Sequence, residues 1–155
     1  MRVGFGFDAH QLVKERKLWL GGIPIDFNMG LKGHSDGDVV LHALADAVLG
    51  ATASGDIGIF FRDDEPSISG IESSKILKFA LSKAEEKGFF LVNVDLVIVA
   101  DKPRLEPIYQ KLRDSIANLC SISIERVSVK AKTTEGTSIN GSAIACYASV
   151  LMDEQ

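Results

Sequence analysis

The residues best suited to metal chemistry gather in the first third of the chain, which contains all three histidines, His10, His34 and His42. Alternate residues of a strand point to the same face, so the carboxylate of Asp8 and the imidazole of His10 can converge on one cation. His42 lies one turn into a helix predicted over 38–52 and can supply a third ligand if that helix packs against the strand. An Asp-His-His set leaves one tetrahedral position open for water or a substrate oxygen, which is typical of catalytic zinc sites.

The spacing of these residues also leaves a purely structural interpretation open. Asp8 could be a turn residue, and His42 could be a hydrogen-bonded histidine on the core side of an amphipathic helix. The spacing therefore indicates a metal site without being specific for one.

Two further polar segments could bind hydroxyls or phosphates. Residues 56–58 and 61–65 are acidic and suit polyol hydroxyls or divalent ions, although a solvated turn would have the same composition. Residues 130–135, Lys-Ala-Lys-Thr-Thr-Glu, end a predicted strand with groups that suit phosphate oxygens and a phosphate-bridging Mg²⁺; an exposed edge strand is the alternative. Strand alternation predicts two faces here, with Lys130, Lys132 and Thr134 on one and Thr133 and Glu135 on the other.

The elements that must position these groups follow from the hydrophobic periodicity. Helices are predicted over 38–52, 73–87 and 104–119, and strands over 2–8, 18–20, 23–25, 89–100, 127–134 and 143–152. This order predicts a single α+β domain, residues 1–155, in which one mixed sheet carries helices on one face. The other face would be left bare, and a bare apolar face favours a homo-oligomer.

Composition excludes several classes of function. A net charge of −4, with no cluster of Lys or Arg residues in the sequence, does not favour binding to nucleic acid or to an anionic membrane. The longest apolar run, 89–100, is interrupted by Asn93 and Asp95 and is too short to span a bilayer. The amino-terminal residues lack the features of a secretory signal, and the two cysteines lack metal or disulfide spacing, so a cytoplasmic protein is expected. Rossmann and Walker phosphate loops are absent from the sequence.

Five motifs in collinear order point to one family. They are Gly-Phe-Asp-Ala-His at 6–10, His-Ser-Asp-Gly-Asp-Val at 34–39, Leu-His-Ala-Leu at 41–44, Gly-Asp-Ile-Gly at 55–58, and the segment 130–135. From Arg2 to about Leu151 the chain resembles the 2-C-methyl-D-erythritol 2,4-cyclodiphosphate synthases.

This resemblance implies a step of non-mevalonate isoprenoid precursor synthesis, in which 4-diphosphocytidyl-2-C-methyl-D-erythritol 2-phosphate cyclises and releases CMP. It implies that Asp8, His10 and His42 bind Zn²⁺ or another divalent transition metal, and that Glu135 holds a Mg²⁺ or Mn²⁺ between the two phosphates. His34 and Thr133 match the positions that stabilise the transition state. The family is a homotrimer whose active sites lie between subunits and whose sheets face the three-fold axis.

The resemblance also implies the residues that contact the substrate, which fall into three groups. The metal-side contacts are Asp8, Ala9, His10, His34 and Ser35. The methylerythritol end is held by Asp56, Ile57, Gly58, Phe61, Arg62, Asp63, Asp64 and Glu65. The cytidine diphosphate side is held by Ala100, Asp101, Lys102, Pro103, Arg104, Leu105, Glu106, Lys132, Thr133, Thr134 and Glu135.

The chain departs from the family pattern at four places. Residues 61–65 are more highly charged than the usual Phe-Pro-Asp-Thr-Asp, and Lys132 replaces a threonine. Phe5 replaces a histidine, and the segment 139–142 lacks an arginine. In the family, that histidine and arginine belong to the polar part of an axial cavity that can hold an isoprenoid diphosphate. We therefore expect weak or no binding of such a regulator, and tight binding of farnesyl diphosphate in calorimetry would contradict this.

Two other functions fit the same residues. A metal-dependent phosphohydrolase or phosphodiesterase would use an open zinc site to activate water, and it would release a linear phosphate. A catalytically silent trimeric nucleotide-binding module would contain no metal after purification.

Overall fold

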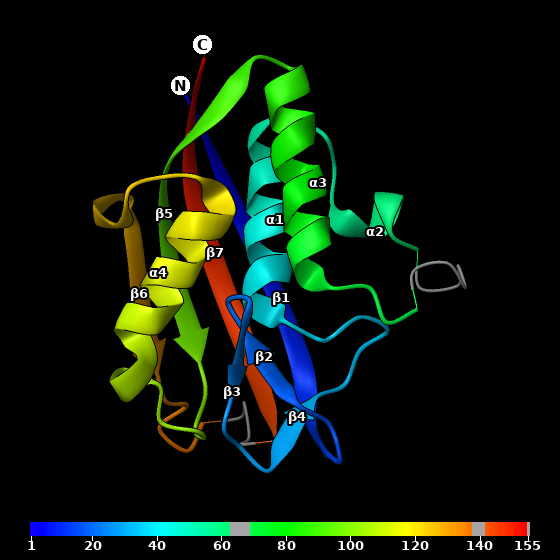
Figure 1. Cartoon of the computed structure of the whole chain (residues 1–155), viewed down its shortest axis with the longest axis vertical. Coiled ribbons are helices and arrows are strands. Elements are labelled where there is room, and N and C mark those ends of the chain that lie inside the picture. The colour runs from blue at the N-terminus through cyan, green and yellow to red at the C-terminus, as the bar shows by residue number, and fades with distance from the viewer. Residues whose placement is uncertain (63–68, 138–141, 155) are drawn as a thin grey trace.

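The chain folds around a five-stranded mixed sheet, described here from a computed structural model for residues 1–62, 69–137 and 142–154 (Figure 1). The strand order is β4-β1-β7-β5-β6, and the β5–β6 pair is parallel while the other pairs are antiparallel. The strands are β1 (Arg2–Lys14), β4 (Met29–Leu31), β5 (Phe89–Val99), β6 (Val127–Lys132) and β7 (Ala143–Glu154). A separate hairpin pairs β2 (Leu18–Leu20) with β3 (Ile23–Ile25), as the sequence predicted.

Three helices cover the same face of this sheet (Figure 1). They are α1 (Val39–Ala51), α3 (Ser73–Glu86) and α4 (Tyr109–Cys120), and a single-turn helix, α2 (Ile57–Phe60), lies beside them. Asp38 begins α1, because its carboxylate accepts hydrogen bonds from the backbone N–H groups of Val40 and Leu41. None of the helices in the described ranges is both long and apolar enough to cross a membrane.

Helix α1 packs directly on β1 because two glycines of the strand face it. A Cβ at Gly4 would lie 1.8 Å from the carbonyl oxygen of Ala47, and one at Gly6 would lie 2.0 Å from that of Ala43. The even-numbered residues of β1 therefore face α1. This close approach brings the first turn of α1 over the strand.

The odd-numbered residues of β1 lie on the opposite, uncovered face of the sheet. Val3 and Phe5 are 71% and 66% exposed. The ring of Phe7 lies 4.8 Å from that of Tyr147 on the neighbouring strand β7, measured between centroids. The expectation of one covered and one bare apolar face is therefore met by this chain.

Several boundaries differ from those predicted. Strand β1 continues beyond residue 8 to Lys14, because residues 9–11 pair with β7 and residues 12–14 pair with β4, a strand of three residues that shows no periodicity. Helix α4 begins at Tyr109, not at 104, since the residues before it form a 3₁₀ turn, Glu106–Ile108, that contains a proline. Residues 57–60, for which no helix was predicted, form α2.

Candidate active site

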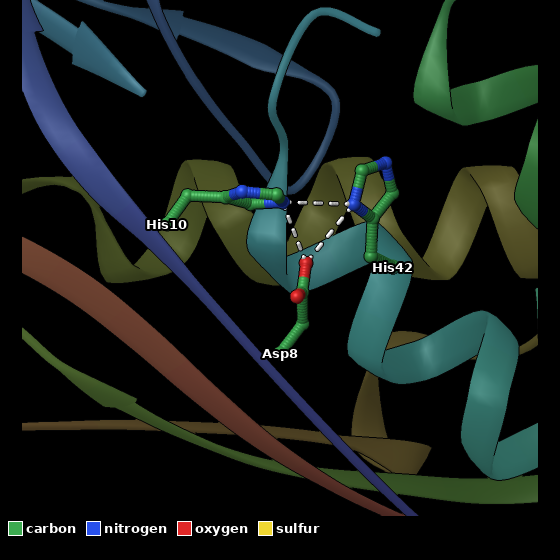
Figure 2. A group of neighbouring side chains, drawn as sticks. All are labelled: Asp8, His10 and His42. Carbon is green, nitrogen blue, oxygen red and sulfur yellow. Dashed lines mark hydrogen bonds and ion pairs between the residues drawn. The ribbon is translucent and has the colours of Figure 1, made fainter. Parts of the chain in front are cut away.

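Three side chains converge between β1 and the first turn of α1 (Figure 2). Asp8 Oδ2 lies 2.9 Å from His10 Nε2 and 3.0 Å from His42 Nδ1, and the two ring nitrogens are 3.3 Å apart. The helix-facing side of β1 presents Asp8 and His10, and α1 presents His42. The convergence predicted from sequence spacing is therefore confirmed.

The triad fits a divalent metal ion in size and chemistry. Two ligand atoms at about 2.0–2.1 Å from a tetrahedral ion lie about 3.3 Å from each other. In this site the 3.3 Å separation already has that value, and the separations of 2.9 and 3.0 Å need only a small expansion to reach it. One carboxylate and two imidazoles are common zinc ligands, and three protein ligands leave a fourth position for water or substrate.

Charge and burial set the protonation of the triad. Burial alone would raise the pKa of Asp8, but the hydrogen bonds and positive charge of the two histidines hold it well below the ordinary value. Burial alone would lower the pKa of His42, but the hydrogen bond and negative charge of Asp8 raise it above 6.5. Without a metal, the site therefore favours a protonated His42 beside an ionised Asp8.

A cavity of about 930 Å³ opens beside the triad. The predicted residues that line it are Asp8, His10, His34, Ser35, His42, Ile57, Gly58, Phe61 and Arg62. Gly33, Ile59, Ile71 and Ile76 also line it and were not predicted, because apolar side chains carry no chemical signal in the sequence. The cavity thus combines a metal-ligating end with an apolar wall.

Two predicted residues support this cavity without lining it. Ala9 alternates to the other face of β1, but its backbone N–H donates to Asp8 Oδ1 at 2.9 Å and helps to orient that carboxylate. Asp56 begins α2 and accepts from the N–H of Ile59 at 3.2 Å.

Two residues that were not predicted from the sequence, Arg16 and Asp46, stabilise the cavity walls through hydrogen bonds to the backbone. The Arg16 guanidinium donates to the carbonyl oxygens of Gly33 and Ser35, both at 2.8 Å, and so fixes the segment that carries His34. The carboxylate of Asp46, one turn after His42 on α1, accepts from the N–H of Ile57 at 2.7 Å and ties α2 to the same helix.

A second polar group forms where β5 and β6 end. The backbone N–H of Thr134 donates to Asp101 Oδ1 at 2.7 Å, and its hydroxyl donates to Asp101 Oδ2 at 2.8 Å. These two bonds lower the pKa of Asp101. The hydroxyl of Thr133 donates to the carboxylate of Glu135. The backbone of Glu135 is left-handed, with a φ of 51°.

The predicted alternation of side chains therefore fails after Lys132. Strand β6 ends there, and Thr134 turns inward to Asp101 and is buried. Of the predicted cytidine-side residues, Leu105 is also buried in the core, whereas Lys132, Thr133 and Glu135 are exposed. The structure brings the segments 100–106 and 132–135 together, since the N–H of Ala100 also donates to the carbonyl oxygen of Lys132 at 2.9 Å.

The two groups of predicted site residues lie on different strands of the sheet. Ala9, beside the triad, pairs with Ala145 on β7, which pairs with Val99 on β5, which pairs with Lys132 on β6. Three strand spacings of about 4.8 Å separate the backbones at these positions by about 14 Å. Among the described residues, Glu135 is not part of the lining of the cavity beside the triad. The predicted contacts Asp63, Asp64 and Glu65, and most of the segment 139–142, lie outside the described residues.

Comparison with known proteins gives a consistent picture along the whole chain. Residues 1–153 match the YgbB family. A 2-C-methyl-D-erythritol 2,4-cyclodiphosphate synthase of Syntrophotalea carbinolica is 47% identical over 99% of this chain and 95% of its own length. The enzyme of the same name from Geobacter metallireducens is 48% identical over the full length of both chains. A solved structure of such a synthase in a CDP-bound form superimposes with a TM-score of 0.92 at 38% identity, covering 98% of this chain and 100% of the other.

Proposed function

This chain belongs to the YgbB family, and we propose that it acts as a 2-C-methyl-D-erythritol 2,4-cyclodiphosphate synthase, like its relatives of that name. The reaction converts 4-diphosphocytidyl-2-C-methyl-D-erythritol 2-phosphate to the cyclic diphosphate and CMP, within the non-mevalonate route to isoprenoid precursors. The convergence of Asp8, His10 and His42 at one end of a substrate-sized cavity is the observation that carries the proposal.

The chemistry is an intramolecular phosphoryl transfer. An oxygen of the 2-phosphate forms a bond to the β-phosphorus of the cytidine diphosphate group, and the bond from that phosphorus to the bridging oxygen of CMP breaks. The nucleophile is part of the substrate, so the protein needs to hold the two phosphates in line and to balance their charge. No protein nucleophile is required.

The triad would hold Zn²⁺ or a similar transition metal, and Glu135 would bind a Mg²⁺ or Mn²⁺ that accompanies the diphosphate. These cations would withdraw negative charge from the phosphate oxygens during transfer. His34, whose backbone is anchored through the neighbouring Gly33 and Ser35 carbonyls, would donate a hydrogen bond to the transferring group from the cavity wall. Thr133 would donate from the Glu135 side.

We propose that a neighbouring subunit completes each active site within a homotrimer. The separation of about 14 Å between the two groups of residues supports this arrangement, because one diphosphate cannot span them within a chain. The exposed apolar face formed by Val3, Phe5 and Phe7 supports burial against other copies around the three-fold axis. A CDP-bound relative supports a cytidine nucleotide as part of the substrate.

Substitutions at the triad test the proposed roles. We expect Asp8→Ala and His42→Ala to lose both zinc and activity, because each removes one of three ligands. We expect His34→Ala to retain zinc and to turn over roughly 100-fold more slowly, since it removes one hydrogen-bond donor to the transition state. Glu86→Ala, which removes an exposed carboxylate that pairs with Lys83 at the end of α3 away from the cavity, is the matched control and should be fully active.

Metal analysis and ³¹P NMR of the products would check these expectations. Cyclic diphosphate with CMP supports the synthase, whereas a linear phosphate would identify a hydrolase. Full zinc content in Asp8→Ala would contradict its role as a ligand.

A further inference from the structure

A buried hydrogen-bonded chain leads away from the metal triad on the far side of His42. His42 Nδ1 faces Asp8, while Nε2 lies 2.8 Å from the hydroxyl of Ser73. Ser73, the first residue of α3, is fully buried, and its hydroxyl also contacts the carboxylate of Asp36. The backbone N–H of Ser73 donates to the other oxygen of that carboxylate at 3.0 Å.

The carboxylate of Asp36, at the end of this series of hydrogen bonds, determines where the protons lie. An ionised carboxylate can only accept, so the Ser73 hydroxyl must donate its single hydrogen to Asp36. The Ser73 oxygen is then left to accept from His42, and once a metal replaces the proton between Nδ1 and Asp8, the ring proton of His42 lies on Nε2. In a neutral imidazole, the other nitrogen, Nδ1, then presents a lone pair toward the triad.

Ser35 is the other hydroxyl near Nε2, and it cannot replace Ser73 equally. Its oxygen lies 3.2 Å from His42 Nε2 and already accepts from the N–H of Gly37 at 3.0 Å. Among the described residues, no carboxylate orients the hydroxyl proton of Ser35, and the Ser35 oxygen lies 3.4 Å from the Ser73 hydroxyl. Ser73 is therefore the better acceptor for the imidazole, because its oxygen is closer to His42 Nε2 and Asp36 orients its hydroxyl hydrogen.

We propose that Ser73 and Asp36 are positioning residues that hold the ring proton of His42 on Nε2 and thereby keep Nδ1 available to the metal. This inference rests on the proposed metal site. Groups that hydrogen-bond to the second nitrogen of a metal-binding histidine fix its tautomer and orientation, and their loss typically weakens metal binding 10- to 100-fold. Here the carboxylate acts through a serine contributed by another helix.

Zinc affinity of the Ser73→Ala variant tests the proposal directly. The metal-free protein would be titrated with zinc in competition with a chromophoric chelator, and we expect the zinc Kd to rise about 10- to 100-fold. Ser74→Ala makes the same change at the next residue of α3, away from the metal cavity, and should bind zinc within twofold of the unsubstituted protein.

The tautomer of His42 provides a readout that a merely structural role would not change. Because Asp8 also accepts at Nδ1 in the metal-free protein, the tautomer is measured by ¹⁵N NMR in the metal-free Asp8→Ala background above the pKa of His42. There we expect the Nε2–H form when Ser73 is present and a larger Nδ1–H population in Ser73→Ala. Asp36→Asn leaves Ser73 in place and should weaken zinc binding through the same change. In the Ser73→Ala background, Asp36→Asn should then have little further effect.

The outcomes separate this inference from the proposed function. If the unsubstituted protein binds no zinc, the proposed metal site is wrong. If it binds zinc but folded Ser73→Ala retains both its affinity and the Nε2–H tautomer, the positioning role is wrong. Should Ser73→Ala fail to fold, an unchanged affinity and tautomer in Asp36→Asn would overturn the proposal equally.

Discussion

At the residue scale, His42 and Asp8 give the metal-free protein a defined pH dependence. The pKa of His42 is raised above 6.5, so its protonated form stabilises the fold fully below pH 6.5, and this contribution is lost as pH rises through the raised pKa. The pKa of Asp8 is lowered from 3.8, so its contribution is present above that pH and is lost as pH falls through the lowered value. Zinc competes with the proton on His42, so zinc affinity should rise with pH.

Thermal unfolding of chelator-treated protein would check this prediction. We expect the midpoint to fall between pH 6 and pH 8 without zinc, and the stabilisation by added zinc to grow over the same range. His34→Ala should keep this behaviour because His34 is outside the triad. If the unfolding midpoint of His42→Gln fell as steeply with rising pH as that of the unsubstituted chain, the pH dependence would not arise from His42.

The residues of the triad could be predicted from sequence, whereas the residues that support it could not. Asp8 and His10 lie on one strand, so the two-residue spacing is enough to place them on one face. Ser73 contacts His42 across 31 positions, and Arg16 reaches the backbone around His34. Such contacts depend on how α3 and the β1–β2 turn fold back on the site, and a serine or arginine in those segments carries no local signal.

At the element scale, the contact between β1 and α1 determines the geometry of the Asp8, His10 and His42 triad. In Gly6→Ala, the new Cβ would meet the backbone of Ala43 at 2.0 Å, so α1 must move away from the strand. We expect a loss of about 3 kcal/mol or more in the free energy of unfolding. Because α1 carries His42, zinc affinity should fall as well.

Gly50→Ala is the control for this substitution, since it places a methyl group on the same helix where the nearest atom is 3.9 Å away. Removing the flexibility of a helical glycine should stabilise the fold by about 0.5–1 kcal/mol without affecting the metal. Chemical denaturation and zinc titration of both variants would measure the difference. Equal stability of the two variants would show that α1 can shift without cost.

Long periodic elements were predictable, whereas short ones were predictable only where a turn signal marks them, as Gly21-Gly22 does between β2 and β3. Helix α1 is indicated by its N-cap, Asp38, and by the spacing of its apolar residues. The predicted range agrees with the observed one to within one residue at each end. Strand β4 and helix α2 contain only three and four residues, so they form through tertiary pairing and a cap, not through a detectable period. The start of α4 was missed because Pro107 stands in a separate turn.

At the scale of the whole molecule, the proposed sharing of active sites between subunits predicts complementation between inactive variants. Asp8→Ala lacks the metal-binding half of the site, and Glu135→Gln lacks the other half. If each site takes one half from each of two neighbours, random mixing in equal amounts makes about a quarter of the sites intact. We therefore expect mixed and reassembled subunits to recover about a quarter of the normal activity.

The experiment requires dissociation and reassembly of the mixed variants, with each variant treated alone as the control. Activity that stays at the level of the separate variants, despite mixed trimers shown by mass spectrometry, would place both halves of a site on one chain. An assembly of another size would be seen in the same measurement.

Strand β1 contributes to the helix contact, to the triad and to the uncovered face of the sheet. Its even positions admit the helix at Gly4 and Gly6 and then supply Asp8 and His10, while its odd positions form the bare aromatic face with Phe5 and Phe7. A library of all single substitutions should therefore find little mutational tolerance on either side of this strand. Insertion or deletion of one residue in β1 would move the following side chains to the opposite face of the sheet. Such a change would disrupt both the triad and the uncovered aromatic face. Evolution of this scaffold toward new chemistry would have to proceed through the loops around the cavity.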